Sequence, residues 1–187
     1  MTRHHDVSPI VERIASLYKN RNIKILEIGC GDGINLVELN KLGFKELYAI
    51  DKDPEKIKIA KEKSPTTNFS TLNALDMDFE DDFFDVIFHS LVGIFMNSDE
   101  REKLTASIFK YLKPQGYYLF EEILRDDNKK EASLKVHPYT SSELDKLTNY
   151  FEEISRENAY RIVNGRKVDG GVIFIGKKRK ICSKPFI

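Results

Sequence analysis

The chain has 187 residues, enough for one domain with a substantial buried core, and its 30 Lys plus Arg residues balance its 30 Asp plus Glu residues. A formal net charge of zero gives no general attraction to nucleic acid or anionic lipid, and no apolar run is long enough to span a bilayer. Two cysteines are too few for a disulfide framework, and no signal-peptide pattern is present, so we expect a cytoplasmic protein. A basic run at residues 177–180 is expected to be a solvated tail.

Strand and helix patterns alternate along most of the chain. The first helix is predicted where Ser8 precedes Pro9, with Ile10 and Ile14 following at helical spacing. From residue 23 on, apolar strands alternate with helices, which is typical of a parallel sheet covered on both faces. Strands are expected at residues 23–28, 46–50, 68–72, 84–89, 117–122, 151–156 and 171–177.

A glycine turn follows the first predicted strand, in the sequence ILEIGCGDG. Gly29, Gly31 and Gly33 occupy every second position, and a helical pattern starts directly after them. Glycines at such a turn let the backbone approach a ligand closely, because a Cβ would collide with it. The dinucleotide fingerprint G-x-G-x-x-G is not matched, and no G-x-x-x-x-G-K-[ST] loop occurs. Glu27, just before the turn, would repel a pyrophosphate but could receive an ammonium group.

The second predicted strand carries an acid at its tip. Asp51 follows residues 46–50, where a carboxylate can accept hydrogen bonds from both hydroxyls of a ribose. Asp53, before Pro54, already supplies the cap for the next helix, so Asp51 is not needed for that purpose. Together with Glu27, Asp51 points to a cofactor with an ammonium group, a ribose and no phosphate, and S-adenosylmethionine meets this description.

The fourth predicted strand ends in His89 at the carboxyl edge of the sheet, where open α/β folds bind ligands. Imidazole titrates near neutral pH, so His89 is the candidate general base, although a histidine here could also only contact the cofactor. Further along, Ser98 is expected to open one helix and Thr140 another. Residues 113–116 are predicted to form a turn before the fifth strand. A polar loop at residues 160–169 indicates antiparallel pairing of the last two strands.

These features resemble the class I S-adenosylmethionine-dependent methyltransferases. The first motif of that family, E/D-x-G-x-G-x-G, is matched by Glu27 and the three glycines of the turn. The resemblance covers residues 23–178 and implies an α/β fold: a doubly wound, mostly parallel seven-stranded sheet with helices on both faces and an antiparallel last strand. It implies a single domain, with an N-terminal helix or lid in residues 1–22, a core in 23–178 and a tail in 179–187.

The resemblance also implies which residues contact the cofactor. The glycine turn would hold its methionine part and Asp51 its ribose. Lys52 stands where the family often has an apolar residue, and its alkyl stem could cover the adenine. Asn73 and Ala74 stand where the family usually has Asp-Ala, and an amide oxygen can accept from the adenine amino group as an acid does. His89 would face the methyl group, as a cofactor contact or as the base. No metal site is expected.

The expected function is transfer of the methyl group of S-adenosylmethionine to a small-molecule acceptor. No appended domain is expected to hold a macromolecule. The segments that could surround a small acceptor are the N-terminal helix with Tyr18, the loop with Phe95 and Met96, and the loop with His137 and Tyr139. Membrane and nucleic-acid partners are not expected. Two alternatives remain: a cofactor-binding regulatory or partner subunit without catalysis, and a methyltransferase acting on RNA or protein. An NAD-dependent oxidoreductase is disfavoured by the glycine spacing and Glu27. The oligomeric state and the acceptor atom (oxygen, nitrogen, sulfur or carbon) stay undecided.

Overall fold

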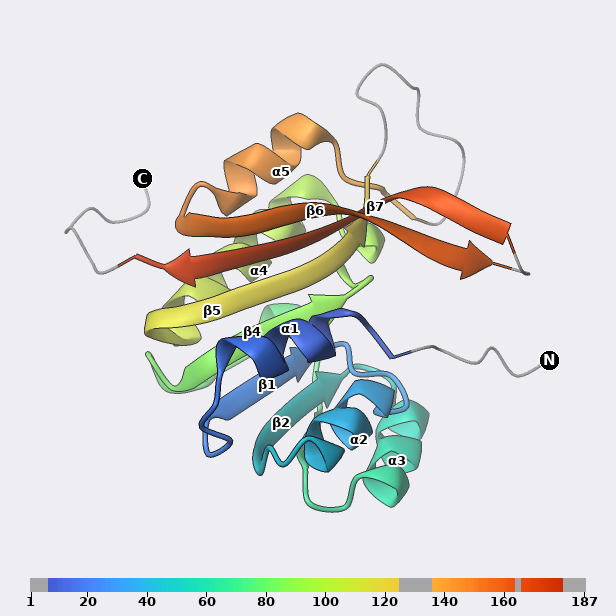
Figure 1. Ribbon diagram of the computed structural model, residues 1–187, viewed down its shortest axis with the longest axis vertical. Coiled ribbons are helices and arrows are strands. Elements are labelled where there is room, and N and C mark those ends of the chain that lie inside the picture. The colour runs from blue at the N-terminus through green and yellow to red at the C-terminus, as the bar shows by residue number, and fades with distance from the viewer. Residues whose placement is uncertain (1–6, 125–135, 164–165, 180–187) are drawn as a thin grey trace.

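A seven-stranded mixed sheet forms the centre of the molecule (Figure 1). The computed structural model describes residues 7–124, 136–163 and 166–179, with only the backbone described for 160–163 and 166–169. The strands are β1 (Lys24–Ile28), β2 (Glu46–Asp51), β3 (Asn68–Thr71), β4 (Phe84–Ser90), β5 (Leu112–Ile123), β6 (Phe151–Val163) and β7 (Arg166–Lys178). Their order is β3-β2-β1-β4-β5-β7-β6. The pairs among β1 to β5 are parallel, and β7 is antiparallel to both β5 and β6. The predicted sheet is therefore confirmed.

Helices cover both faces of this sheet. Within the described residues they are α1 (Ile10–Leu17), α2 (Ile34–Lys41), α3 (Pro54–Lys63), α4 (Ser98–Tyr111) and α5 (Ser141–Thr148), with two short 3-10 turns, η1 (Ala74–Asp76) and η2 (Gly93–Phe95). Apolar side chains of α1, α2 and α3 pack in one core cluster, and those of α4 and α5 pack in a second. In Figure 1, α1 and α2 lie in front of the sheet and α4 lies behind it. The doubly wound arrangement is thus confirmed. No helix among the described residues combines the length and apolarity needed to cross a membrane.

Local capping explains where the helices begin. The side chain of Asp53 accepts from two backbone N–H groups at the start of α3, and that of Thr140 caps α5, both as predicted. The predicted cap of α4, Ser98, is wrong by one residue. Asn97 accepts from the N–H of Glu100, and the Glu100 carboxylate accepts from the N–H of Asn97. This reciprocal pair satisfies two donors that would otherwise lack partners, so it fixes the start of α4.

The last strands differ from the prediction. β5 begins at Leu112, which pairs with Phe84, and the register then skips to the pair of Val86 and Tyr117. The predicted turn at residues 113–116 therefore lies within β5 as an irregularity. The predicted loop at residues 160–169 is also wrong, because β6 and β7 stay paired out to the pair of Val163 and Arg166. Residues 164–165, between them, lie outside the described residues.

One residue of the basic C-terminal run is part of the core. Lys178 is 3% exposed, and its Nζ donates to Asp82 Oδ1 and to the Leu112 carbonyl, each at 2.6 Å. A buried ammonium needs such partners to offset the loss of hydration. The expectation of a solvated tail is therefore wrong for Lys178, while residues 180–187 lie outside the described part of the chain.

Candidate active site

The glycine turn joins β1 to α2 at the carboxyl edge of the sheet. Gly29, Gly31 and Gly33 have φ values of 68°, 54° and 78°, which residues with a Cβ rarely adopt. The N–H of Gly29 donates to the carbonyl of Ile50 at 2.8 Å, so the turn is fixed to the end of β2. A Cβ at Gly33 would lie 2.9 Å from Ala60 Cβ, so this glycine lets α2 and α3 approach each other. A Cβ at Gly31 would meet no atom of the described residues within 4 Å, so the described part of the chain leaves open space at this position of the turn.

Glu27 is a buried carboxylate directly before this turn, and it is 2% exposed. Its Oε1 accepts from Asn35 Nδ2 at 2.7 Å, while its Oε2 is buried and has no hydrogen-bond partner among the residues that the structure describes. Burial raises the pKa of Glu27 from 4.5 to about 8, the hydrogen bond from Asn35 opposes this shift, and the charges of Asp51 and Asp32 add to it. A buried oxygen without a partner is costly, so an added cation or donor at Oε2 would stabilise the site.

A network of hydrogen bonds connects Glu27 to the N-terminal helix. The N–H of Ser8 donates to Asn35 Oδ1 at 2.8 Å, and the Ser8 hydroxyl donates to Glu121 Oε2 at 2.8 Å. The same Glu121 oxygen accepts from the Ser90 hydroxyl at 2.9 Å. Sequence reasoning treated Ser8 only as a helix start. It could not find this role, because the two partners lie 27 and 113 residues away along the chain.

Asp51 lies at the end of β2, beside the glycine turn. Its Oδ2 accepts from the N–H of Gly31 at 2.8 Å, and its Oδ1 accepts from the N–H of Asp53 at 2.9 Å. An ionised carboxylate offers about four lone-pair sites, so both oxygens keep acceptor capacity. The neighbouring Lys52 is exposed. The structure therefore holds a carboxylate with spare acceptor capacity directly beside the open space at Gly31.

The loop after β3 carries the predicted adenine contacts. The N–H of Leu72 donates to the carbonyl of Asp51 at 2.9 Å, which places this loop at the same edge of the sheet. Asn73 is exposed, and its Oδ1 accepts from the N–H of Leu75 at 3.0 Å as the cap of η1. Ala74 is half-buried against the α4 and α5 core cluster. One acceptor site of the Asn73 amide is thus already used by the backbone.

His89 points to the opposite face of the sheet from Glu27. In the β1–β4 register, Glu27 pairs with Phe88 and Ile28 pairs with His89. Neighbouring side chains along a strand point to opposite faces. Phe88 belongs to the cluster under α1 and α2, whereas Ile28 belongs to the cluster under α4 and α5. The structure therefore does not bring His89 and Glu27 together on one face.

The His89 ring is enclosed by polar and aromatic groups and is 0% exposed. Its Nε2 lies 2.7 Å from the Tyr118 hydroxyl, and its Nδ1 lies 3.1 Å from Glu122 Oε1 without a well-aligned hydrogen bond. The ring stacks on Phe120, with centroids 5.5 Å apart. Sequence reasoning missed these partners because they come from β5, whose register against β4 is not written in the sequence. The base role of His89 stays a prediction.

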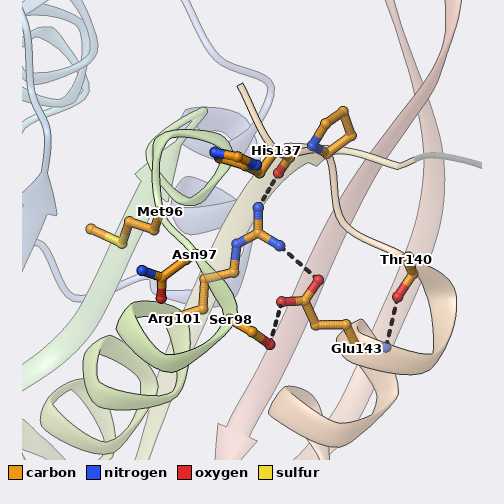
Figure 2. A pocket seen from close by; sticks show the side chains of 8 residues that line it. Met96, Asn97, Ser98, Arg101, His137, Thr140 and Glu143 are labelled. Atoms are coloured by element: carbon orange, nitrogen blue, oxygen red, sulfur yellow. Dashed lines mark hydrogen bonds and ion pairs between the residues drawn. The ribbon is translucent and has the colours of Figure 1, made fainter. Parts of the chain in front are cut away.

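A pocket of about 420 Å³ opens between the start of α4 and the segment that leads into α5 (Figure 2). It is lined by Met96, Asn97, Ser98, Arg101, His137, Pro138, Thr140 and Glu143. The Arg101 guanidinium donates to the Gly93 carbonyl at 2.9 Å, to Glu143 Oε2 at 2.6 Å and to the His137 carbonyl. It also lies over the ring of Tyr139, 3.8 Å from its centroid. Two of the segments expected to surround an acceptor, those with Met96 and with His137, thus meet at this pocket, where Arg101 bonds to both. Tyr18 does not line it, because its hydroxyl donates to the Asp85 carbonyl at the start of β4.

Comparison with known proteins identifies related chains. A family model described as a methyltransferase domain matches residues 26–120. Ribosomal protein L11 methyltransferase of Thermoanaerobacter sp. (strain X514) is 30% identical over 118 residues, 62% of this chain and 36% of that protein. Phosphoethanolamine N-methyltransferase of Plasmodium falciparum (isolate 3D7) is 22% identical over 153 residues, 80% of this chain and 52% of that protein. The chain thus spans about a third to a half of the length of these curated relatives.

A solved structure matches nearly the whole chain. It is a SAM-dependent methyltransferase from Methanosarcina mazei, similar with a TM-score of 0.76 and 23% identity. The match covers 94% of this chain and 99% of the other. The two chains share one fold over this length.

Proposed function

Because the chain belongs to the methyltransferase-domain family of class I S-adenosylmethionine-dependent methyltransferases, we propose that it transfers the methyl group of S-adenosylmethionine to a small-molecule acceptor. The donor site of this proposal is the glycine turn with Glu27 and Asp51, and the acceptor site is the pocket beside Arg101.

The side chains around the glycine turn fit the donor. Glu27 Oε2, which is buried and has no partner in the described part of the chain, would receive the ammonium group. The open space at Gly31 would admit the ligand against the backbone, and the spare acceptor capacity of Asp51 would take the ribose hydroxyls. Lys52 and Asn73 are exposed at the same edge, where they would flank the adenine. No phosphate-binding feature is needed for this ligand.

The protein's task in this reaction is mainly positioning. S-adenosylmethionine supplies a methyl group already activated by a sulfonium, so holding the acceptor in line and excluding water can provide most of the rate. Ser8 holds α1 against the Glu27 side of the site, which would shield it from water. For an acceptor that loses a proton, His89 is the proposed base, and the Glu122 carboxylate, 3.1 Å from its Nδ1, would orient the ring.

The pocket is the observation that carries the small-molecule proposal. Its volume of about 420 Å³ falls within the range of roughly 300–1,000 Å³ that small ligands occupy. The loop after β4 connects it to the donor turn, because Val92 packs on Gly29 while Met96 lines the pocket. Main-chain carbonyls, hydroxyls and a paired Arg101–Glu143 offer polar groups that would orient an acceptor.

A protein acceptor is the second candidate. The match to a methyltransferase named for a ribosomal protein favours it. Phe95, beside the pocket, is 61% exposed and could contact a larger partner. Both candidate functions use the same donor site, so they differ only in the molecule that accepts the methyl group.

Methyl-labelled S-adenosylmethionine distinguishes the candidates. We would incubate the protein with a low-molecular-weight metabolite extract, and separately with total cellular protein and RNA. The proposal expects label in the small-molecule fraction, lost in Asp51→Ala and kept in Asp53→Asn, a matched change that leaves a helix cap in place. Label only in protein or RNA would overturn the small-molecule proposal. Binding of S-adenosylhomocysteine without any transfer would favour a non-catalytic subunit.

A further inference from the structure

Three buried side chains from separate elements hold the loop after β4. Glu122 of β5 is 0% exposed, and its Oε1 accepts from the N–H of Val92 at 3.0 Å and of Gly93 at 2.7 Å. Arg101 of α4 donates to the Gly93 carbonyl at 2.9 Å. Tyr139 packs so closely on Gly93 that a Cβ there would collide with the tyrosine hydroxyl. The peptide groups around Gly93 are therefore fixed from both sides.

The same loop rests on the glycine turn. Val92 packs directly on Gly29, where a Cβ would collide with the Val92 side chain. Leu91, at the start of the loop, has a φ of 57°, and its N–H donates to the carbonyl of Glu121 at 2.8 Å. A residue with a Cβ is strained in this conformation, which persists only where its surroundings impose it. The loop is thus held in a strained position against the proposed donor site.

The buried carboxylate of Glu122 is energetically unfavourable at a core position. Its Oε2 is buried and has no partner within residues 7–124, 136–163 and 166–179, which the structure describes. The other neighbours of the carboxylate are His89, at 3.1 Å, and Tyr139, whose pKa its charge helps to raise. A buried acceptor without a partner destabilises the fold relative to an apolar residue of the same shape. A carboxylate here is explained by the two loop N–H groups it binds, not by core stability.

We propose that Glu122 is a positioning residue for methyl transfer. By accepting from the backbone N–H groups of Val92 and Gly93, it holds the loop against Gly29. In this position the loop separates the donor turn from the acceptor pocket. His89 contacts the same carboxylate, so the loop and the proposed base are placed by one group. This inference rests on the proposed function, because the loop can position a donor only if the donor lies on the glycine turn.

The test compares two changes at Glu122. Glu122→Met keeps the length of the side chain but removes the acceptor, whereas Glu122→Gln keeps an acceptor oxygen. For Glu122→Met we expect faster hydrogen exchange at the amides of Val92 and Gly93. We also expect a roughly 100-fold lower rate of label transfer to the metabolite extract at saturating donor, the size of loss that a small misplacement can cause. Affinity for S-adenosylhomocysteine should change less than about tenfold, and Glu122→Gln should restore most of the rate.

Control variants distinguish a loss of loop positioning from a folding defect and from a failure of the proposed function. Asp85→Leu is the matched change, because it also removes a carboxylate that accepts a backbone N–H, that of Lys24 at 2.9 Å, but at the far end of β4. It should leave loop exchange and rate unchanged. Val92→Ala, which removes the contact with Gly29 at a half-buried site, should lower the rate even if Glu122→Met does not fold. If Glu122→Met folds and shows wild-type rates of methyl transfer and of amide exchange in the loop, this inference is overturned. A wild-type transfer rate in Val92→Ala would also overturn it. Neither result would contradict the proposed function. Absence of transfer by the wild-type protein would instead overturn the proposed function.

Discussion

Donor binding should depend on pH through Glu27. The buried Glu27 carboxyl has its pKa raised to about 8, so the free protein holds a proton on it at neutral pH. The proposed pairing with an ammonium group requires the ionised form, so this proton must leave when the ligand binds. We therefore expect the affinity for S-adenosylhomocysteine to rise with pH up to about 8.

The raised pKa sets the size of this effect. At pH 6, about two units below that pKa, only about 1% of Glu27 is ionised, so affinity should be about 100-fold weaker than at its plateau, or about 2.7 kcal/mol. The unliganded protein should show the opposite trend. Because the folded pKa is raised, the native state keeps a proton that the unfolded chain loses above 4.5, so this group's contribution to the free energy of unfolding falls from pH 4.5 to about 8.

Titration calorimetry from pH 6 to pH 8, in buffers of different ionisation enthalpy, measures both affinity and proton release. Wild-type protein should release close to one proton per ligand at pH 6.5. Glu27→Gln, which keeps the shape and the contact to Asn35, should bind weakly, without this pH dependence and without proton release. Affinity in the wild-type protein that does not vary with pH, or equal affinity in the two proteins at pH 8, would refute the assignment of Glu27.

Four further predictions follow from single residues. Asp51→Ala should weaken S-adenosylhomocysteine binding by at least about 100-fold, because two charge-assisted hydrogen bonds from the ribose hydroxyls, each worth about 1.5–3 kcal/mol, are lost; unchanged affinity by calorimetry would remove Asp51 from the site. Gly31→Val should abolish binding in a protein with a normal circular-dichroism spectrum, because a β-branched side chain is strained at φ 54° and fills the open space; wild-type affinity would place the ligand elsewhere. His89→Ala should lower turnover by roughly 10²–10⁴-fold with binding intact if His89 is a base; a loss of binding with normal saturated turnover would make it only a contact. Lys178→Met should lower the free energy of unfolding by about 1–3 kcal/mol in denaturant titrations, because the buried Leu112 carbonyl loses its donor; donor affinity should not change, and wild-type stability would contradict this role.

The features that the sequence predicts well are local. The alternating glycines, Glu27 and Asp51 lie within one strand–turn–helix–strand unit, so their chain spacing determines their position in space. The order of strands and helices follows from hydrophobic periodicity, and Asp53 and Thr140 mark helix starts through their own neighbours. These parts of the fold depend on contacts between residues close together along the chain.

The parts that could not be predicted depend on register and on distant partners. Whether Glu27 and His89 share a face is decided by how β1 pairs with β4, and a shift of one residue would reverse the answer. The burial of Lys178 depends on Asp82, 96 residues away. The link from Ser8 to Glu121 joins residues 113 positions apart. A single sequence contains the residue types of such pairs but not the pairing.

A crystal structure with S-adenosylhomocysteine bound measures the donor site most directly. We predict the ligand above Gly31, with its ammonium nitrogen within hydrogen-bond distance of Glu27 Oε2 and both ribose hydroxyls donating to Asp51. Glu27 Oε2 would then no longer be unpartnered, and Val92 would stay packed on the glycine turn. A ligand bound elsewhere on the sheet edge, or one bound at the turn with Glu27 Oε2 still without a partner, would contradict the proposed site.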